Sequence, residues 1–222
     1  MLFFEFFRWL CLITGYPFQL FLFKRKTYYE DKSVQSLKIR GGALVISNHY
    51  HFYDYMMNMF AVMPRKLHVV SSEMPYRTKI GAFGMKFFGG IQANRITKDM
   101  RFMDEAADVI RKGGLVQIYP EGRITSDGNL QPFKHSYIVI AHRAGAPIIP
   151  IVTDGNYGFK KRAHILVGTP IYVSDYITSD VRTPSREDLR AVNEMVYNKV
   201  FAMRARLDEL IEQDKNKRKK DK

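Results

Sequence analysis

Short apolar runs alternate with amphipathic segments along most of this chain, and this alternation limits the possible folds more than any other feature. Short apolar runs are typical of buried strands, whereas apolar residues spaced three and four positions apart are typical of helices. We therefore expect an α/β domain with a mixed, mostly buried sheet flanked by helices. The expected strands are 42–47, 67–71, 114–118, 147–152 and 163–167, and the expected helices are 52–63, 77–87, 99–112, 135–144 and 185–213.

The length and composition indicate one globular domain. A chain of 222 residues, with 46% hydrophobic and 26% charged residues, is long enough to bury a substantial core. Cys11 is the only cysteine, which excludes a disulfide framework and a cysteine metal site and indicates a reducing compartment. The formal net charge of +13 is spread through the chain and suits an anionic membrane or a nucleic acid as partner, unless it serves solubility alone.

The first 26 residues favour the membrane over nucleic acid, because Phe and Leu are dense there and Lys24-Arg25-Lys26 follows. Gly15-Tyr16-Pro17 is expected to break or kink a helix in the middle of this segment. Two short amphipathic helices in the bilayer interface are therefore expected, with a helix that covers the core as the alternative. The predicted organisation is a membrane-anchoring segment at 1–26, a catalytic domain at 27–213 and a basic disordered tail at 214–222.

A histidine and an aspartate, His49 and Asp54, lie close together between an expected strand and an expected helix. An imidazole at a strand end can accept a proton from a substrate hydroxyl, and a carboxylate in the next helix can hold it in the useful tautomer. No serine or cysteine is placed beside this pair as a nucleophile, which indicates direct attack by a substrate alcohol. With His51, the pair also has the look of a metal site, but that interpretation needs more ligands than the spacing offers.

Three further stretches at the ends of expected strands carry residues suited to a substrate. Gly89-Gly90 permits close backbone approach, and Arg95 is either a phosphate ligand or a solvated side chain. Pro120 and Gly122 bracket Glu121, and Arg123 follows; an ordinary turn with a Glu–Arg pair is the alternative. Two prolines make 146–152 a poor central strand, so an edge strand or a short strand lining an apolar groove is expected, with plain core as the alternative.

Four blocks, in this order, resemble the glycerolipid acyltransferase family, and most closely its bacterial 1-acyl-sn-glycerol-3-phosphate (lysophosphatidic acid) acyltransferases. The likeness covers roughly residues 35–172 and adds an N-terminal membrane segment of the expected kind. The blocks are Asn48-His49-x4-Asp54, Gly90 through Arg95, Pro120-Glu121-Gly122 and Ile149-Pro150.

The resemblance implies transfer of a fatty acyl chain from acyl-CoA or acyl-carrier protein to the free hydroxyl of 1-acyl-sn-glycerol-3-phosphate, giving phosphatidic acid in phospholipid biosynthesis. It implies that His49 is the general base and that Asp54 orients it, without a metal or a cofactor. The partners are then the lipid bilayer, a lysophospholipid acceptor and the acyl donor, without nucleic acid, and the location is peripheral or monotopic on the cytoplasmic face of the cell membrane. The substrate-binding residues implied are Asn48, Gly90, Arg95, Glu121, Gly122, Arg123, Ile149 and Pro150.

Two departures from the family pattern leave the acceptor open. Arg123 follows Gly122 directly, one place earlier than is common, and Ile124 fills the usual position. After Lys134, His135-Ser136 stands where the family usually has a pair ending in glycine. An acyltransferase for another lysophospholipid is one alternative, and a basic peripheral lipid-binding protein without catalysis is another.

Overall fold

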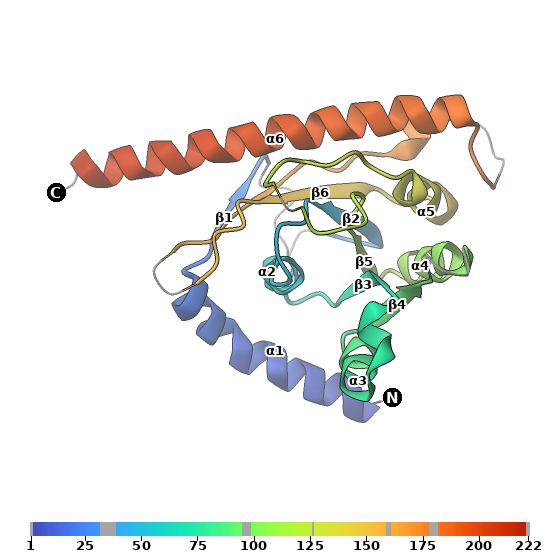
Figure 1. Cartoon of the computed structure of the whole chain (residues 1–222), viewed down its shortest axis with the longest axis horizontal. Helices are drawn as coiled ribbons and strands as arrows, with labels where there is room; N and C mark the ends of the chain where they lie inside the picture. The colour runs from blue at the N-terminus through green and yellow to red at the C-terminus, as the bar shows by residue number, and fades with distance from the viewer. Residues whose placement is uncertain are drawn as a thin grey trace.

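The computed structural model describes residues 2–31, 39–94, 99–125, 127–158, 161–177 and 182–220. Within these residues, seven strands form one sheet in the order β1-β7-β6-β2-β5-β3-β4 (Figure 1). Neighbouring strands are parallel, except that β6 and β7 are antiparallel. The strands are β1 Lys26–Tyr29, β2 Ala43–Ser47, β3 Leu67–Ser72, β4 Gly90–Ala93, β5 Leu115–Ile118, β6 Ile148–Thr153 and β7 His164–Val167.

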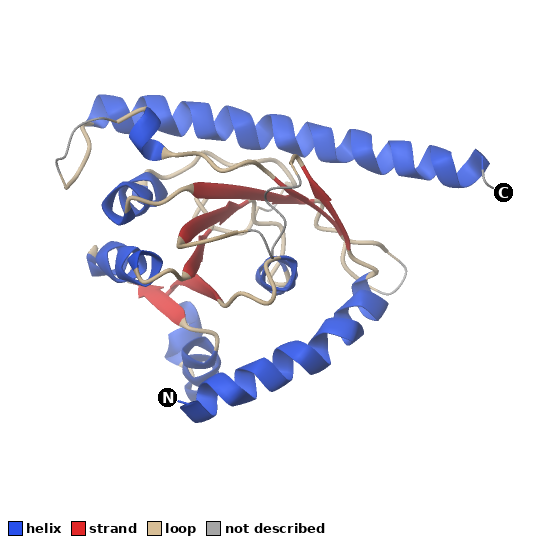
Figure 2. Ribbon diagram, turned by 180° about the vertical axis from the view of Figure 1, so that it is seen from behind, coloured by secondary structure: helices blue, strands red, loops and turns tan. Residues whose placement is uncertain are grey.

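Helices cover both faces of the sheet, which confirms the predicted mixed α/β fold with flanking helices (Figure 2). Adjacent residues of β2 point to opposite faces, so Leu44 and Val45 belong to different core clusters. The cluster of Val45 includes residues of α1 and α2, and the cluster of Leu44 includes residues of α4, α5 and α6. The helices are α1 Leu2–Phe23, α2 Asp54–Ala61, α3 Lys79–Phe87, α4 Arg101–Arg111, α5 Ser136–Ala144 and α6 Arg186–Lys220, with short 3-10 helices η2 Met74–Arg77 and η3 Val173–Asp175.

Two strands of the sheet, β1 and β4, were outside the predicted set. Both are four residues long and lie at the two edges of the sheet, where each pairs with a single neighbour. Such short, partly polar segments become strands because a partner strand offers its free edge, and their own hydrophobic pattern contributes little.

The proline-containing strand β6 lies between β2 and β7, so the expectation of an edge strand is wrong. The N–H and C=O of one strand residue point to the same side, and the carbonyl oxygen of Pro150 accepts from the N–H of Gly168 at 2.8 Å. Gly168 follows the last residue of β7, so the N–H that Pro150 lacks falls at the end of that ladder. The parallel pairing of β6 with β2 therefore loses no hydrogen bond to this proline.

The N-terminal segment forms one curved helix through Gly15 and Pro17, so the expectation of two short helices is wrong (Figure 1). Proline removes one backbone hydrogen bond, and tertiary packing offsets this loss. Leu12 and Phe23 are buried in the core, and Gly15 lies against the ring of Phe60. Among the described residues, no helix has both the length and the apolar character needed to cross a membrane.

The last helix, α6, continues to Lys220, so the predicted disordered tail is wrong for residues 214–220. Lysine, arginine, glutamate and glutamine are good helix formers, which favours continuation of the helix. Asp214 contacts Lys26 and Tyr28 of β1, so the end of α6 is tied to the edge of the sheet.

Candidate active site

The turn between β2 and α2 brings His49 and Asp54 together. Asp54 is the first residue of α2, where a negative charge interacts favourably with the helix dipole. Its Oδ2 atom lies 2.9 Å from Nδ1 of His49 and accepts the backbone N–H groups of Tyr50 at 2.8 Å and His51 at 2.7 Å. Two backbone N–H groups of the turn thus bind one carboxylate oxygen of Asp54. These hydrogen bonds fix the orientation of the carboxylate relative to the imidazole.

The other carboxylate oxygen of Asp54 is held from β6 and the loop that follows it. Tyr157 donates its hydroxyl hydrogen to Oδ1, and Oγ1 of Thr153 lies 3.4 Å from the same atom. Burial, reinforced by the Asp54 charge, raises the pKa of Tyr157 well above its ordinary value, so the phenol stays a neutral donor. Asp54 is completely buried, and these partners compensate for the loss of water around its charge.

The geometry assigns opposite roles to the two nitrogens of His49. A carboxylate only accepts hydrogen bonds, so in the neutral imidazole Nδ1 carries the hydrogen and Nε2 keeps a lone pair that can accept a proton. The imidazole stacks on the ring of Tyr119, with centroids 3.8 Å apart and planes 11° apart, and this fixes the ring plane. The His49 side chain is 17% exposed, so a substrate can reach it while its supporting carboxylate stays buried.

Asn48 and Glu121 hold the turn in place through backbone contacts. The Asn48 amide donates to the carbonyl oxygen of Thr153 at 3.0 Å and accepts the N–H of Thr153 at 2.9 Å. The Glu121 carboxylate accepts the N–H groups of His49 and Gln131, both at 2.9 Å. Burial raises the pKa of Glu121, although these two N–H donors act against the rise. Both side chains thus position the site, and their predicted contact with substrate stays a prediction.

Gly122 and its neighbours form a basic rim beside His49. Gly122 has a φ of +69°, and a Cβ at this position would lie 2.7 Å from Nζ of Lys134. Arg123 is exposed and donates to Oε1 of Gln131 at 2.9 Å. The backbone N–H groups of His49 and Gly122 both donate within the loops, to Glu121 and to the carbonyl of Tyr119. These two N–H groups are therefore occupied, and the rim can bind an anionic group through the side chains of Arg123 and Lys134.

The strand register shows which end of β4 belongs to this site. Gly90 of β4 pairs with Val69 of β3. Val69 and Val45 of β2 both pair with Gln117 of β5, so Gly90 is level with Val45 in the middle of the sheet. A Cβ on Gly90 would lie 2.7 Å from the Tyr76 hydroxyl, so this glycine serves close packing. Counted in the same way, the end of β4 is level with Asn48. Arg95, predicted to bind phosphate, lies outside the described residues.

Ile149 and Pro150 are buried in β6 and point to opposite faces of the sheet. Ile149 belongs to the cluster that includes α1 and α2, whereas Pro150 lies on the α6 side, where the Cβ position of Gly168 is 2.8 Å from its ring. The two side chains therefore do not form one wall. A role of either residue in substrate binding stays a prediction.

Sequence reasoning missed Tyr157, Thr153 and Tyr119. Thr153 and Tyr119 directly follow predicted strands, so their position at the strand ends was a usable signal. Tyr157 had no such signal, because it lies 103 residues from Asp54 and reaches it through a loop. Among the described residues, no group of three or more His, Cys, Asp or Glu side chains is arranged to hold a metal ion.

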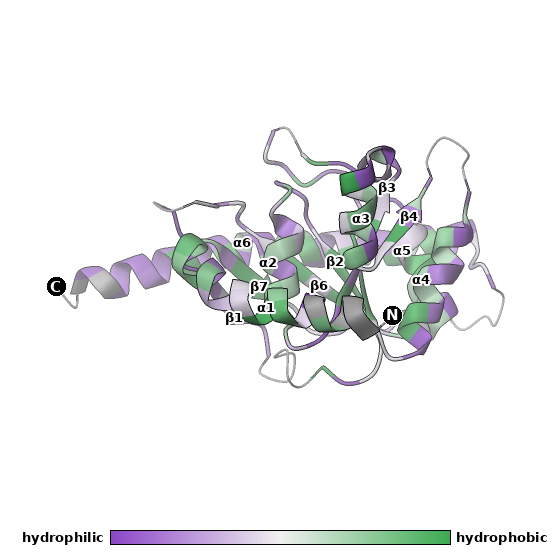
Figure 3. Ribbon diagram, turned by 90° about the horizontal axis from the view of Figure 1, so that it is seen from below, coloured by the Kyte–Doolittle hydropathy of each residue, from purple (hydrophilic) through white to green (hydrophobic). Residues whose placement is uncertain are grey.

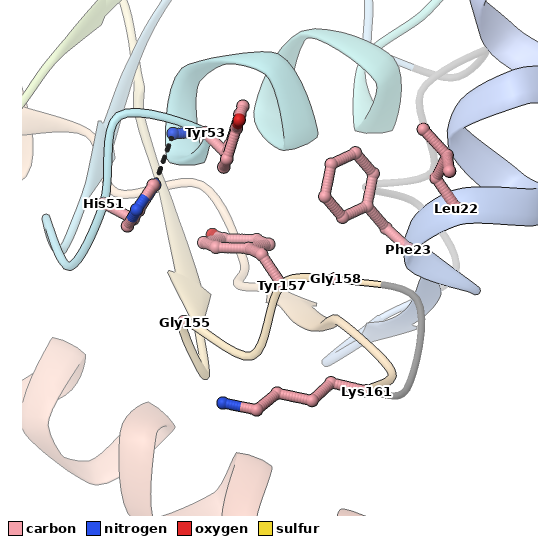
Figure 4. Close-up of a pocket in the computed structure, with 8 residues that line it drawn as sticks. All are labelled: Leu22, Phe23, His51, Tyr53, Gly155, Tyr157, Gly158 and Lys161. Atoms are coloured by element: carbon pink, nitrogen blue, oxygen red, sulfur yellow. Dashed lines mark hydrogen bonds between the residues drawn. The ribbon is translucent and has the colours of Figure 1, made fainter.

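A cavity of about 450 Å³ lies behind Tyr157, between the end of α1 and the His49 turn. In Figure 4, the Tyr157 ring stands between His51 and Phe23, and the side chain of Lys161 extends below Gly155. Aromatic walls and one lysine thus adjoin the residue that supports Asp54.

Comparison with known proteins places this geometry in a family. A family model described as Acyltransferase matches residues 25–154. The chain is 27% identical over 145 residues to the human 1-acyl-sn-glycerol-3-phosphate acyltransferase beta, covering 63% of this chain and 51% of that protein. It is 28% identical over 165 residues to the 1-acyl-sn-glycerol-3-phosphate acyltransferase of Haemophilus influenzae, covering 69% and 68%. It is 22% identical over 216 residues to 1-acyl-sn-glycerol-3-phosphate acyltransferase BAT2, chloroplastic, of Brassica napus, covering 82% and 62%.

Among solved structures, the fold is similar to that of the 1-acyl-sn-glycerophosphate (LPA) acyltransferase PlsC from Thermotoga maritima. The TM-score is 0.60 at 16% sequence identity, covering 89% of this chain and 78% of that chain. This chain spans only about half to two thirds of the human and Brassica proteins. The matched region contains the His49 turn, the basic rim and β6, and the chain belongs to the acyltransferase family.

Proposed function

We propose that this protein transfers a fatty acyl chain to the free hydroxyl of 1-acyl-sn-glycerol-3-phosphate and so forms phosphatidic acid. The observation that carries the proposal is the 2.9 Å contact between Nδ1 of His49 and the buried Asp54 carboxylate, in a chain of the acyltransferase family. The human and Haemophilus influenzae relatives are 1-acyl-sn-glycerol-3-phosphate acyltransferases, which supports this choice of acceptor.

The proposed reaction needs one base and no covalent intermediate on the enzyme. Nε2 of His49 takes the proton of the acceptor hydroxyl while that oxygen attacks the thioester carbonyl of the acyl donor. The tetrahedral intermediate collapses with cleavage of the carbon–sulfur bond, and the imidazolium returns the proton to the departing thiolate. Asp54 stays ionised and stabilises the imidazolium formed between these steps. The residues supply proton transfer and orientation, so we propose that no metal or cofactor takes part.

We propose that the basic rim binds the acceptor phosphate. Arg123 and Lys134 flank Gly122, and the positive φ of this glycine lets the backbone pass close to Lys134. Arg95 is proposed as a third phosphate ligand from its sequence position after β4. The thioester donor is acyl-CoA or acyl-carrier protein, and both are acidic molecules that suit a chain with a net charge of +13.

We further propose that residues 1–26 dock the acyltransferase domain on a membrane, at its cytoplasmic face. The two faces of helix α1 reverse the usual pattern of a surface helix. Its buried face includes the polar residues Arg8 and Gln19, whereas its exposed face is strongly apolar. The Arg8 guanidinium donates to the carbonyl oxygen of Leu67 at 3.0 Å, which ties the inner face to β3. Apolar side chains on the outer face suit the boundary between head groups and acyl chains. The exposed residues are Phe6, Trp9, Leu10, Ile13, Phe18, Leu20 and Phe21.

An acceptor panel tests this function. Purified protein is incubated with isotope-labelled acyl-CoA or acyl-carrier protein and with lysophospholipids that differ only in head group, and the product lipids are identified by mass spectrometry. Labelled phosphatidic acid as the main product supports the proposal. Transfer only to another lysophospholipid would overturn the acceptor, and no transfer to any of them would overturn the enzymatic function.

A further inference from the structure

The segment formed by η2 and α3 exposes large apolar side chains outside the proposed docking helix. Ile80 keeps 88% of its surface exposed, Phe83 59% and Met74 57%. Single exposed apolar residues are common on soluble proteins, but three within so short a segment form a patch. We call Met74, Ile80 and Phe83, with the basic residues beside them, the α3 patch.

The charged residues within η2 and α3 are all basic, and Glu73 directly precedes η2. Arg77, Lys79 and Lys86 are exposed, and residues 74–87 contain no acidic residue. Ile80 and Phe83 are three positions apart on α3, so they lie on one side of the helix, and Lys79 and Lys86 flank them. Apolar side chains with flanking lysines and arginines are typical of helices that lie in the surface of an anionic bilayer.

Helix α3, which carries most of the α3 patch, lies on the same side of the molecule as α1. Figures 1 and 2 show α3 beside the N-terminal end of α1, and the view from the α1 side in Figure 3 shows both helices facing the reader. Helix α6 lies across the opposite side of the sheet (Figure 1). β3 ends at Ser72 and η2 begins at Met74. The patch therefore starts at the carboxyl ends of the parallel strands, and His49 follows the carboxyl end of β2.

We propose that the α3 patch is a second bilayer contact, which acts together with α1 to seat the active-site edge on an anionic lipid surface. The proposal rests on the proposed membrane docking of α1 and adds a second point of contact. A bilayer is the occupant because two separate elements of like composition face one side, and an extended flat surface reaches both. One helix alone leaves the molecule free to roll about that helix. Two contacts fix the tilt of the domain, so that His49 faces an acceptor held in the bilayer.

The sequence offers a direct optical test, because Trp9 on α1 is the only tryptophan. In a Trp9→Phe background, Ile80→Trp places a fluorescent probe on α3, and Phe201→Trp places a matched probe on α6. Ile80 and Phe201 are both exposed, so neither substitution disturbs the core. Emission of each full-length variant is recorded with vesicles of phosphatidylcholine and phosphatidylglycerol, with and without brominated acyl chains. Pure phosphatidylcholine vesicles serve as the uncharged comparison.

We expect a blue shift and bromine quenching for the α3 probe on anionic vesicles, and no change for the α6 probe. In the wild-type background, the double variant Met74→Glu/Ile80→Glu should bind these vesicles about fivefold more weakly, with an unchanged circular dichroism spectrum.

The outcomes separate the two proposals. If wild-type Trp9 responds and the α3 probe does not, the second contact is overturned and docking by α1 stands. If neither responds, both proposals fail. An α6 probe that responds as strongly as the α3 probe indicates unoriented adsorption and overturns the second contact. A response of the α3 probe to acidic acyl-carrier protein but not to vesicles would assign the patch to a protein partner instead.

Discussion

Tyr157 donates its hydroxyl hydrogen to Oδ1 of Asp54, while Oδ2 of the same carboxylate faces Nδ1 of His49. The buried carboxylate is thus held between a phenol from the loop after β6 and the imidazole that it orients. This arrangement makes the loop after β6 part of the candidate active site, although it lies far from the His49 turn in the sequence.

The first prediction concerns Tyr157→Phe, which removes the hydroxyl and keeps the ring. We expect kcat to fall by about tenfold with little change in KM, because Asp54 loses one of its hydrogen bonds and orients His49 less well. Steady-state kinetics with both substrates measure this. The matched control is Tyr176→Phe, at an exposed tyrosine that directly follows η3. An unchanged kcat in Tyr157→Phe would contradict the positioning role.

The second prediction concerns Glu121→Gln, which keeps the shape of the side chain and removes one acceptor. An amide NH₂ would face one of the two backbone N–H groups that Glu121 now accepts, so we expect a loss of about 1–3 kcal/mol in the free energy of unfolding and a clear loss of activity. Urea denaturation and acyl-transfer assays measure these effects. The exposed Glu105→Gln on α4 should change neither. Wild-type stability in Glu121→Gln would show that these bonds contribute little.

The third prediction concerns the buried pair of Asp154 and His164, whose Oδ2 and Nδ1 atoms lie 2.6 Å apart. Burial alone would raise the pKa of Asp154, but hydrogen bonds from His164 and Asn156 outweigh it and hold the pKa below its ordinary value of 3.8. A carboxyl with a lowered folded-state pKa stabilises the fold above its ordinary pKa, and this contribution is lost as the pH falls through the folded-state pKa.

Asp154→Asn should therefore lower the free energy of unfolding more at pH 7 than at a pH below 3.8. Urea denaturation of wild type and variant at both pH values measures the difference. An equal effect at both pH values would mean that the carboxylate charge contributes no stability. Because Asp154 also accepts the backbone N–H of Asn156, at 3.1 Å, the substitution should loosen the loop that carries Tyr157 and lower kcat as well.

The fourth prediction concerns Arg123→Ala. If Arg123 binds the acceptor phosphate, the KM for the lysophospholipid should rise by about tenfold while the KM for the acyl donor stays unchanged. The exposed Arg206→Ala on α6 removes the same charge at a residue that pairs with Glu209 instead of lying in the basic rim, and it should leave both values as they are. Normal acceptor KM with a lowered kcat in Arg123→Ala would contradict phosphate binding.

Sequence alone predicted the features that depend on neighbouring residues. The strands at 42–47 and 114–118 were predictable because their apolar runs are buried on both faces of the sheet. The pairing of His49 with Asp54 was predictable because both residues belong to one turn. Each of these features is encoded within a few positions of the chain.

The features that sequence reasoning missed depend on distant contacts. β1 and β4 form because β7 and β3 offer free edges, and Pro150 is tolerated because its missing N–H falls at the end of β7. Tyr157 reaches Asp54 only because β6 lies next to β2. These contacts depend on the packing of the whole sheet, so no local sequence pattern predicts them.

We propose that His49, oriented by Asp54, is the base of an acyl transfer. The most direct test is the rate of labelled phosphatidic acid formation from acyl donor and 1-acyl-sn-glycerol-3-phosphate, compared between wild type, His49→Ala and His142→Ala. His142 lies in the last turn of α5. The chain leads from there into the start of β6, whereas His49 follows the other end of the parallel strand β2. We predict that His49→Ala lowers the rate by about 10²–10⁴-fold with the fold intact, and that His142→Ala keeps the wild-type rate. A His49→Ala protein that is folded and transfers acyl chains at the wild-type rate would contradict the account.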